Sequence, residues 1–253
     1  MKPVCLVIGA GAGIGGNVGK RFALDGYHSV LCRRSDEAGL HNLVADIENA
    51  GGSASGYLLD ATADNAIEER IAAVEADIGP IEVVVYNLGA QIGNRSLEET
   101  SYKAFELGWR MGTFGLFRTA SAVCPLMEAR GSGTILVTSA TSAMRGNAGQ
   151  HSHAAAMGGR RMLCQSLNAQ FAPKGIHVAH ILVDGAVDAP DTLGKMLGAE
   201  QFQRLRETRG AQDGLMKPEK MAETYFHIAQ QHRSVWTHEL DMRSFSDLAW
   251  WNH

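Results

Sequence analysis

Two histidines lie close together in the stretch GNAGQHSHAAAMGG, which covers residues 146–159. An imidazole titrates near pH 6.5, so His151 and His153 are candidates for transferring protons at neutral pH. A histidine pair is also typical of metal sites, but no carboxylate or cysteine accompanies this one at a suitable spacing. The stretch therefore predicts acid chemistry at His153, or a histidine that only fills space on a helix, and it predicts no metal site.

A second candidate site is the glycine-rich turn VIGAGAGIGG, in which Gly9, Gly13 and Gly15 stand between an apolar run and a helical pattern. Glycines at such a turn allow a tight bend and let backbone N–H groups approach a pyrophosphate at the helix N-terminus. The turn therefore indicates dinucleotide binding. The alternative is a glycine-rich turn that binds no ligand.

Two arginines, Arg33 and Arg34, end the second apolar run in VLCRRSD. An acidic residue at this place would accept hydrogen bonds from the adenosine ribose of NAD(H). A guanidinium instead pairs with a 2′-phosphate, so NADP(H) is favoured over NAD(H), with one of the two arginines serving only as a solvated loop charge. Asp36 and Glu37, which follow, are predicted to stabilise the start of the next helix.

The whole chain resembles the short-chain dehydrogenase/reductase family, beginning with the GxxxGxG spacing of its glycine turn. YNLGA matches the family's NNAG element with Tyr86 in place of the first Asn, and VDGAV matches the turn after the sixth strand, with Asp184 where a proline is usual. The resemblance implies that Asp60 contacts the adenine and that the backbone of Val187 holds the nicotinamide carboxamide. It assigns cofactor binding to Gly9, Gly13, Ile14, Gly15, Arg33, Arg34, Asp60, Ala61, Asn87, Gly89 and Val187.

The family's catalytic tetrad is not matched by this sequence. The resemblance places His153 at the Tyr position, Met157 at the Lys position, Ala140 at the Ser position and Gly112 at the Asn position. All four residues differ from the family pattern, and Ser142 and His151 are further candidate groups nearby. General acid catalysis typically contributes about 10²–10⁴-fold, so ordinary ketone or alcohol chemistry is expected to be very slow.

Three classes of function remain open. The leading hypothesis is an atypical NADP(H)-dependent oxidoreductase that acts on a small organic substrate, such as an activated carbonyl, an imine or iminium, or an enone. A non-redox isomerase, lyase or cyclase would use His151, His153 and Asp184. A catalytically silent NADP(H)-binding protein is the third class, and Met157 favours it because an apolar side chain there indicates packing.

Short apolar runs that alternate with helical segments must position these residues, and they predict βαβ units. The expected strands cover residues 3–8, 28–33, 54–59, 81–86, 133–139, 175–183 and 234–242. We therefore expect an α/β fold with a doubly wound, parallel, seven-stranded sheet (a Rossmann fold), helices on both faces and a single domain over residues 1–253. The polar, helix-prone segment at about residues 190–214 is a candidate substrate lid.

Composition excludes several partners of the 253-residue chain. Its net charge of −4 gives no basic field for nucleic acid or an anionic membrane, and no apolar stretch is long enough to span a bilayer. Four widely spaced cysteines and an N-terminal apolar run too short for a signal peptide fit reduced thiols in a cytoplasmic protein.

The family resemblance implies a homodimer or homotetramer. The ending LAWWNH is expected to cover the substrate pocket, lie in a subunit interface or anchor the tail, and Trp236 is expected in the last strand.

Overall fold

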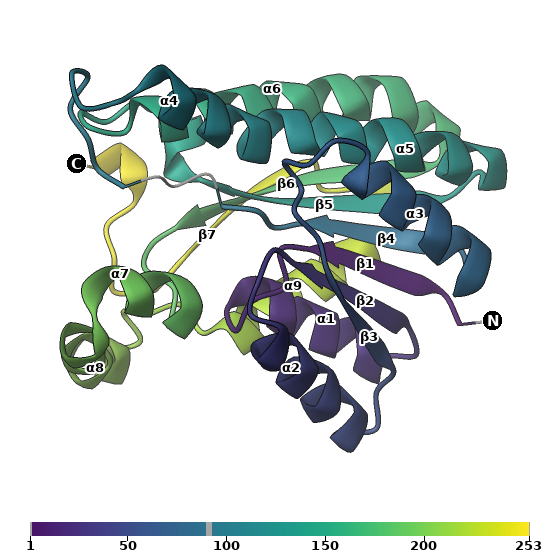
Figure 1. The fold of residues 1–253 in the computed structure, drawn as a ribbon, viewed down its shortest axis with the longest axis horizontal. Helices are drawn as coiled ribbons and strands as arrows, with labels where there is room; N and C mark the ends of the chain where they lie inside the picture. The colour runs from purple at the N-terminus through teal and green to yellow at the C-terminus, as the bar shows by residue number, and fades with distance from the viewer. Residues whose placement is uncertain (1, 90–92, 253) are drawn as a thin grey trace.

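Seven parallel strands form the sheet of this computed structural model, which describes residues 2–89 and 93–252 (Figure 1). Their spatial order is β3-β2-β1-β4-β5-β6-β7, and every pairing of neighbours is parallel. The strands are β1 (Val4–Ile8), β2 (His28–Arg33), β3 (Ala54–Leu58), β4 (Ile81–Tyr86), β5 (Gly133–Ala140), β6 (Ile176–Asp184) and β7 (Glu239–Arg243). The predicted parallel seven-stranded sheet is confirmed.

Strand β1 is apolar along its whole length because both faces of the sheet are covered. All five residues of β1 are buried, as expected for a parallel strand between two helical layers. The expected strands at 28–33 and 81–86 have the bounds of β2 and β4. The expected last strand at 234–242 is wrong at its start, because β7 begins only at Glu239.

Trp236 therefore lies outside β7, which corrects the prediction for this residue. It follows a short 3-10 turn (Arg233–Val235) and stacks on His177, with ring centroids 4.8 Å apart. Its indole N–H donates to the carbonyl of Gln231 at 3.2 Å. These contacts hold the tryptophan in the connection that leads into the strand.

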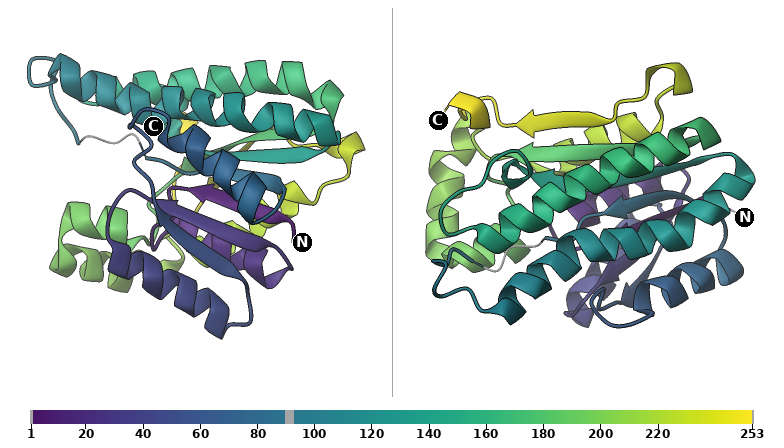
Figure 2. Two further views of the ribbon diagram at one scale, coloured as in Figure 1. Left: turned by 45° about the vertical axis from the view of Figure 1, so that its right-hand side comes forward. Right: turned by 90° about the horizontal axis from the view of Figure 1, so that it is seen from above.

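Helices cover both faces of the sheet, as predicted (Figures 1 and 2). α3, α4, α5 and α6 form one layer, and α1, α2 and α9 form the other, while α7 and α8 lie to one side of the second layer. The helices are α1 (Ile14–Leu24), α2 (Glu37–Asn49), α3 (Ala66–Asp77), α4 (Tyr102–Trp109), α5 (Gly115–Arg130), α6 (His151–Phe171), α7 (Lys195–Leu197), α8 (Ala199–Thr208) and α9 (Pro218–Ala229). A π-helical turn (Arg110–Phe114) joins α4 to α5, and a second one (Pro190–Gly194) precedes α7.

A buried arginine ties α6 to the ends of two strands. Arg160 is 1% exposed, and its guanidinium donates to the carbonyls of Gly112 (2.8 Å) and Leu88 (2.8 Å) and to that of Thr138. These carbonyls belong to the π-helical turn before α5, the loop after β4 and strand β5. The guanidinium also lies 5.2 Å from the ring centroid of Tyr86. One side chain thus fixes the relative position of four elements.

Removing this guanidinium is expected to destabilise the fold strongly. Arg160→Met keeps most of the apolar stem but leaves buried carbonyls without their donors, so we expect a loss of about 3 kcal/mol in the free energy of unfolding. The neighbouring Arg161 pairs with Glu239 near the surface, and Arg161→Met is expected to cost only about 1 kcal/mol. Urea unfolding of the two variants measures the difference. Equal losses would contradict the role given to Arg160.

A buried histidine on β6 makes the fold sensitive to acid. His180 is 0% exposed, and its Nδ1 atom lies 3.0 Å from an oxygen of Glu239. Burial lowers the pKa of His180 to about 4, against the opposing attraction of Glu239 and with a smaller contribution from Arg160 and Arg161. The imidazole is therefore neutral in the folded protein at neutral pH.

The pH dependence of stability follows from this low pKa. Between pH 6.5 and 4 the unfolded chain binds a proton at His180 that the folded chain does not, so stability falls as pH falls through this range. His180→Gln should reduce the slope of unfolding free energy against pH by about 1 kcal/mol per pH unit. Chemical denaturation at several pH values tests this, and parallel pH slopes for variant and parent would contradict it.

Candidate functional site

Strands β1 and β4 are neighbours at the point where the strand order of the sheet reverses: the chain continues from β1 to β2 on one side and from β4 to β5 on the other. In open α/β sheets this switch point forms a crevice at the carboxyl ends of the strands. Here the Asn87 backbone N–H donates to the Ile8 carbonyl at 2.8 Å, and its side-chain amide donates to the Gly9 carbonyl at 2.9 Å. The structure thus places the glycine turn beside Asn87.

The glycine turn leaves no room for side chains where it faces its neighbours. Gly9 has a φ of +102°, and a Cβ atom there would lie 2.8 Å from the Asn87 backbone. A Cβ at Gly13 would lie 2.8 Å from the Cβ of Ala189. Gly15 is buried in the first turn of α1, which Ile14 begins. These residues form the narrow strand-to-helix cradle that a pyrophosphate requires, so they fit a nicotinamide dinucleotide.

A charged cluster lies against this cradle. The Ala12 N–H donates to Asp191 Oδ2 at 2.9 Å, and the Arg33 guanidinium donates to the same oxygen at 3.1 Å. Arg33 also pairs with Asp36 at 3.0 Å, and its side chain is 13% exposed. The backbone and the arginine therefore converge on one carboxylate oxygen, which makes this an anion-binding position.

The Asp191 carboxylate is ionised at this position. Burial acts to raise its pKa, but the hydrogen bond from Ala12 and the charges of Arg33 and Lys195 outweigh burial and leave the pKa lowered. Sequence patterns marked Asp191 only as part of the candidate lid at about residues 190–214. The segment is helical, as expected, and its role as a lid stays a prediction.

The second arginine and the predicted adenine contact lie after β2 and β3. Arg34 is exposed, which agrees with the expectation that one arginine is a solvated loop charge. Asp60 accepts hydrogen bonds from the backbone N–H and the hydroxyl of Thr62 at 2.9 and 2.7 Å, and these bonds lower its pKa. The adjacent Ala61 is buried, and its carbonyl accepts from Arg118. The carboxylate orientation is thus fixed before any ligand binds.

The remaining cofactor candidates follow β4 and β6. Gly89 is exposed, and Ala90 of the YNLGA motif lies outside the described residues. Val187 pairs with Met216 through an isolated parallel bridge, which holds its backbone in an extended conformation. Asp184 is buried, and its carboxylate accepts a hydrogen bond from the backbone N–H of Trp250 at 2.9 Å. Its carboxylate therefore anchors the C-terminal tail.

The predicted catalytic positions around α6 are largely apolar. His153 lies in the first turn of α6 and is 7% exposed. Ala140 packs against Ala156 and Met157, and the Ser139 hydroxyl lies 3.8 Å from the Met157 sulfur. The structure thus brings Ala140 and Met157 together, in surroundings that suit packing better than proton transfer.

The other candidates lie on the loops and turns nearby. The Ser142 hydroxyl contacts the Gln150 side-chain oxygen at 3.2 Å, and His151 is half-buried at the start of α6. Gly112 is buried in the π-helical turn Arg110–Phe114, where its carbonyl accepts from Arg160. Such π-helical turns are frequent at functional sites. Sequence reasoning assigned no role to Arg160, although its position two turns after His153 indicates the same helix face.

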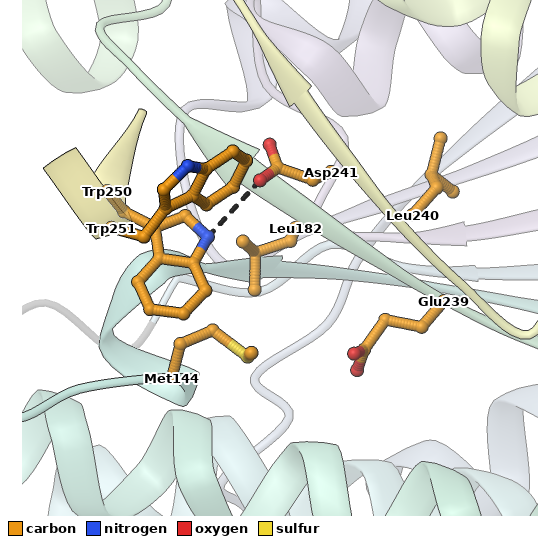
Figure 3. A pocket seen from close by; sticks show the side chains of 7 residues that line it. All are labelled: Met144, Leu182, Glu239, Leu240, Asp241, Trp250 and Trp251. Carbon is orange, nitrogen blue, oxygen red and sulfur yellow. Dashed lines mark hydrogen bonds between the residues drawn. The ribbon is translucent and has the colours of Figure 1, made fainter. Parts of the chain in front are cut away.

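The C-terminal tail lines a cavity of about 240 Å³ beside β6 and β7 (Figure 3). The indole N–H of Trp250 donates to the Asp241 carboxylate at 3.2 Å, and the backbone carbonyl of Trp250 accepts from Arg145 at 2.8 Å. The lining residues are Met144, Leu182, Glu239, Leu240, Asp241, Trp250 and Trp251. No described lining residue is one to which the sequence patterns assigned catalysis or cofactor binding.

Neither a metal cluster nor a membrane-spanning helix is found in the part of the chain that the structure describes. Within residues 2–89 and 93–252, no group of three or more His, Cys, Asp or Glu residues is placed to hold a metal ion. Over the same ranges, no helix combines the length and apolar character needed to cross a membrane.

Comparison with known proteins identifies the family. The short chain dehydrogenase model matches residues 3–193. The short-chain reductase protein NovJ of Streptomyces niveus is 29% identical over 242 residues, covering 94% of this chain and 91% of NovJ. A short-chain dehydrogenase structure from Rhodopseudomonas palustris is 32% identical with a TM-score of 0.80, covering 96% of this chain and 99% of that one. A metagenomic short-chain oxidoreductase in complex with NADP shares the fold, at 20% identity and a TM-score of 0.79, over 97% of this chain and 98% of that one. The chain belongs to the short-chain dehydrogenase/reductase family of oxidoreductases.

Proposed function

We propose that this protein is an NADP(H)-dependent oxidoreductase acting on a small organic substrate with an activated carbonyl, an imine or iminium, or an enone. The supporting observation is that the Ala12 N–H and the Arg33 guanidinium meet at one anionic oxygen beside the glycine turn. A 2′-phosphate presents oxygens of the same charge, and it is the group that distinguishes NADP(H) from NAD(H).

Most of the proposed cofactor-binding residues then have a defined task. The backbone of the glycine turn faces the pyrophosphate, Arg33 binds the 2′-phosphate, and the already oriented Asp60 carboxylate accepts from the adenine amine. Asn87 holds the turn in shape through its hydrogen bond to Gly9. Val187 offers its backbone to the carboxamide. NADPH, when bound, supplies a hydride.

His153 is the proposed proton donor. It lies in the first turn of α6, and an imidazole can donate a proton without a lysine beside it. Met157 contributes no charge to assist this proton transfer. The alternative to a role for His153 is a substrate that needs little acid assistance, such as an iminium or a polarised alkene.

The cofactor assignment predicts a selective loss of NADPH affinity on changing Arg33. Arg33→Ala removes a charge-assisted hydrogen bond to the 2′-phosphate, so the Kd for NADPH should rise at least tenfold, while the Kd for NADH should change less than threefold. Fluorescence titration measures both constants. Arg34→Ala, which removes an exposed arginine next in the chain, is the matched control and should have a smaller effect. Equal losses for both nucleotides, or no saturable NADPH binding by the parent, would refute the assignment.

The role of His153 predicts a loss of turnover without a loss of binding. His153→Gln should lower NADPH oxidation with an imine, enone or activated ketone by about 10²-fold and leave the Kd for NADPH unchanged. His151→Gln, two residues away, is the control and should retain most activity. A His153→Gln variant as active as the parent would remove His153 from the mechanism. Substrate consumption with no change in nicotinamide absorbance would instead favour a non-redox enzyme.

A further inference from the structure

The chain beyond Val187 lies directly on the glycine turn. Ala189 is 3% exposed, and its Cβ occupies the space into which a side chain at Gly13 would extend. A Cβ at Gly11 would lie 3.3 Å from Asp191 Oδ2. The π-helical turn Pro190–Gly194 therefore places a carboxylate against the cradle.

Arg33 faces more negative charge than it can neutralise. Its guanidinium lies 3.0 Å from Asp36 and 3.1 Å from Asp191. A bound 2′-phosphate would add a third anionic group beside one guanidinium, so one carboxylate must move away or weaken the binding.

Asp191 is the carboxylate that can move. Asp36 is the N-cap of α2 and accepts from the Gly39 N–H at 3.0 Å, so displacing it would disrupt a helix. Asp191 belongs to a connecting segment and has a second cation, Lys195, 3.4 Å away. Lys195 remains beside Asp191 along the segment when the contact with Arg33 is lost.

We propose that Asp191 determines cofactor specificity by competing with the 2′-phosphate of NADP(H) for Arg33 and the Ala12 N–H. This inference rests on the proposed NADP(H) function. A 2′-phosphate displaces the carboxylate, whereas the 2′-hydroxyl of NAD(H) leaves it in place and can donate to it. Asp191 therefore lowers the affinity for NADP(H) relative to the affinity for NAD(H). It also couples NADP(H) binding to release of the 190–194 segment from Arg33.

Isothermal titration calorimetry with two fragments tests the proposal on the full chain. Adenosine 2′,5′-bisphosphate carries the 2′-phosphate, and 5′-AMP lacks it. Asp191→Asn keeps the shape and removes the charge, so it should bind the bisphosphate about tenfold tighter and bind 5′-AMP within twofold of the parent. Asp191→Glu retains the charge and should stay within threefold of the parent for both ligands.

Asp188→Asn is the matched control. Asp188 lies just before the 190–194 segment and pairs with Arg206 at 2.7 Å, so its change should leave both affinities unaltered. Equal binding of the bisphosphate by Asp191→Asn and the parent would overturn the competition, as would weaker 5′-AMP binding without a gain for the bisphosphate.

NADPH binding by the parent protein distinguishes failure of this inference from failure of the proposed function. If the parent binds NADPH and Asp191→Asn shows no gain, only the competition fails. If neither protein binds NADPH or the bisphosphate, the cofactor assignment fails and the inference fails with it. If the parent binds NADPH and Asp191→Asn binds the bisphosphate more tightly than the parent does, both the assignment and the competition are supported.

Discussion

The close approach of two strand ends is the constraint on which the rest of this structure depends. The turn after β1 lies so near the chain after β4 that a Cβ at Gly9 would lie 2.8 Å from the backbone of Asn87. Because the turn is this tight, α1 starts with its backbone N–H groups facing the crevice at the switch point of the sheet. Arg33, at the end of β2, approaches the Ala12 N–H of the glycine turn, and these two groups form the anion-binding position.

The region around α6 differs from the anion-binding position because apolar packing dominates it. Met157 and Ala140, which the family resemblance predicts to occupy catalytic positions, lie in an apolar cluster, and the carbonyl of Gly112 accepts from Arg160. A buried guanidinium, Arg160, holds that carbonyl and those of two strand ends in place. The region around α6 is thus held together by packing and by one buried charge, while His153 is the proposed proton donor.

Local patterns predicted most of the fold because parallel strands buried on both faces are continuous apolar runs. They placed β2 and β4 at their observed bounds and failed at β7, where Trp236 and its neighbours have strand-like composition but lie in a connection. The site was harder to predict because its important contacts are not local. Asp191 is 158 residues from Arg33 in the chain, and no spacing rule indicates that they meet. The position of Arg160 on α6 predicts its helix face but not the three carbonyls that surround it.

The anion-binding position beside the glycine turn is proposed to hold the 2′-phosphate of NADP(H), and the proposed preference for NADP(H) over NAD(H) depends on this. A crystal structure of the protein with NADPH tests it most directly. We expect the 2′-phosphate within hydrogen-bond distance of both Arg33 and the Ala12 N–H, with the Asp191 carboxylate displaced from them. A bound nucleotide whose 2′-phosphate lies elsewhere, with the contact between Asp191 and Arg33 intact, would contradict it.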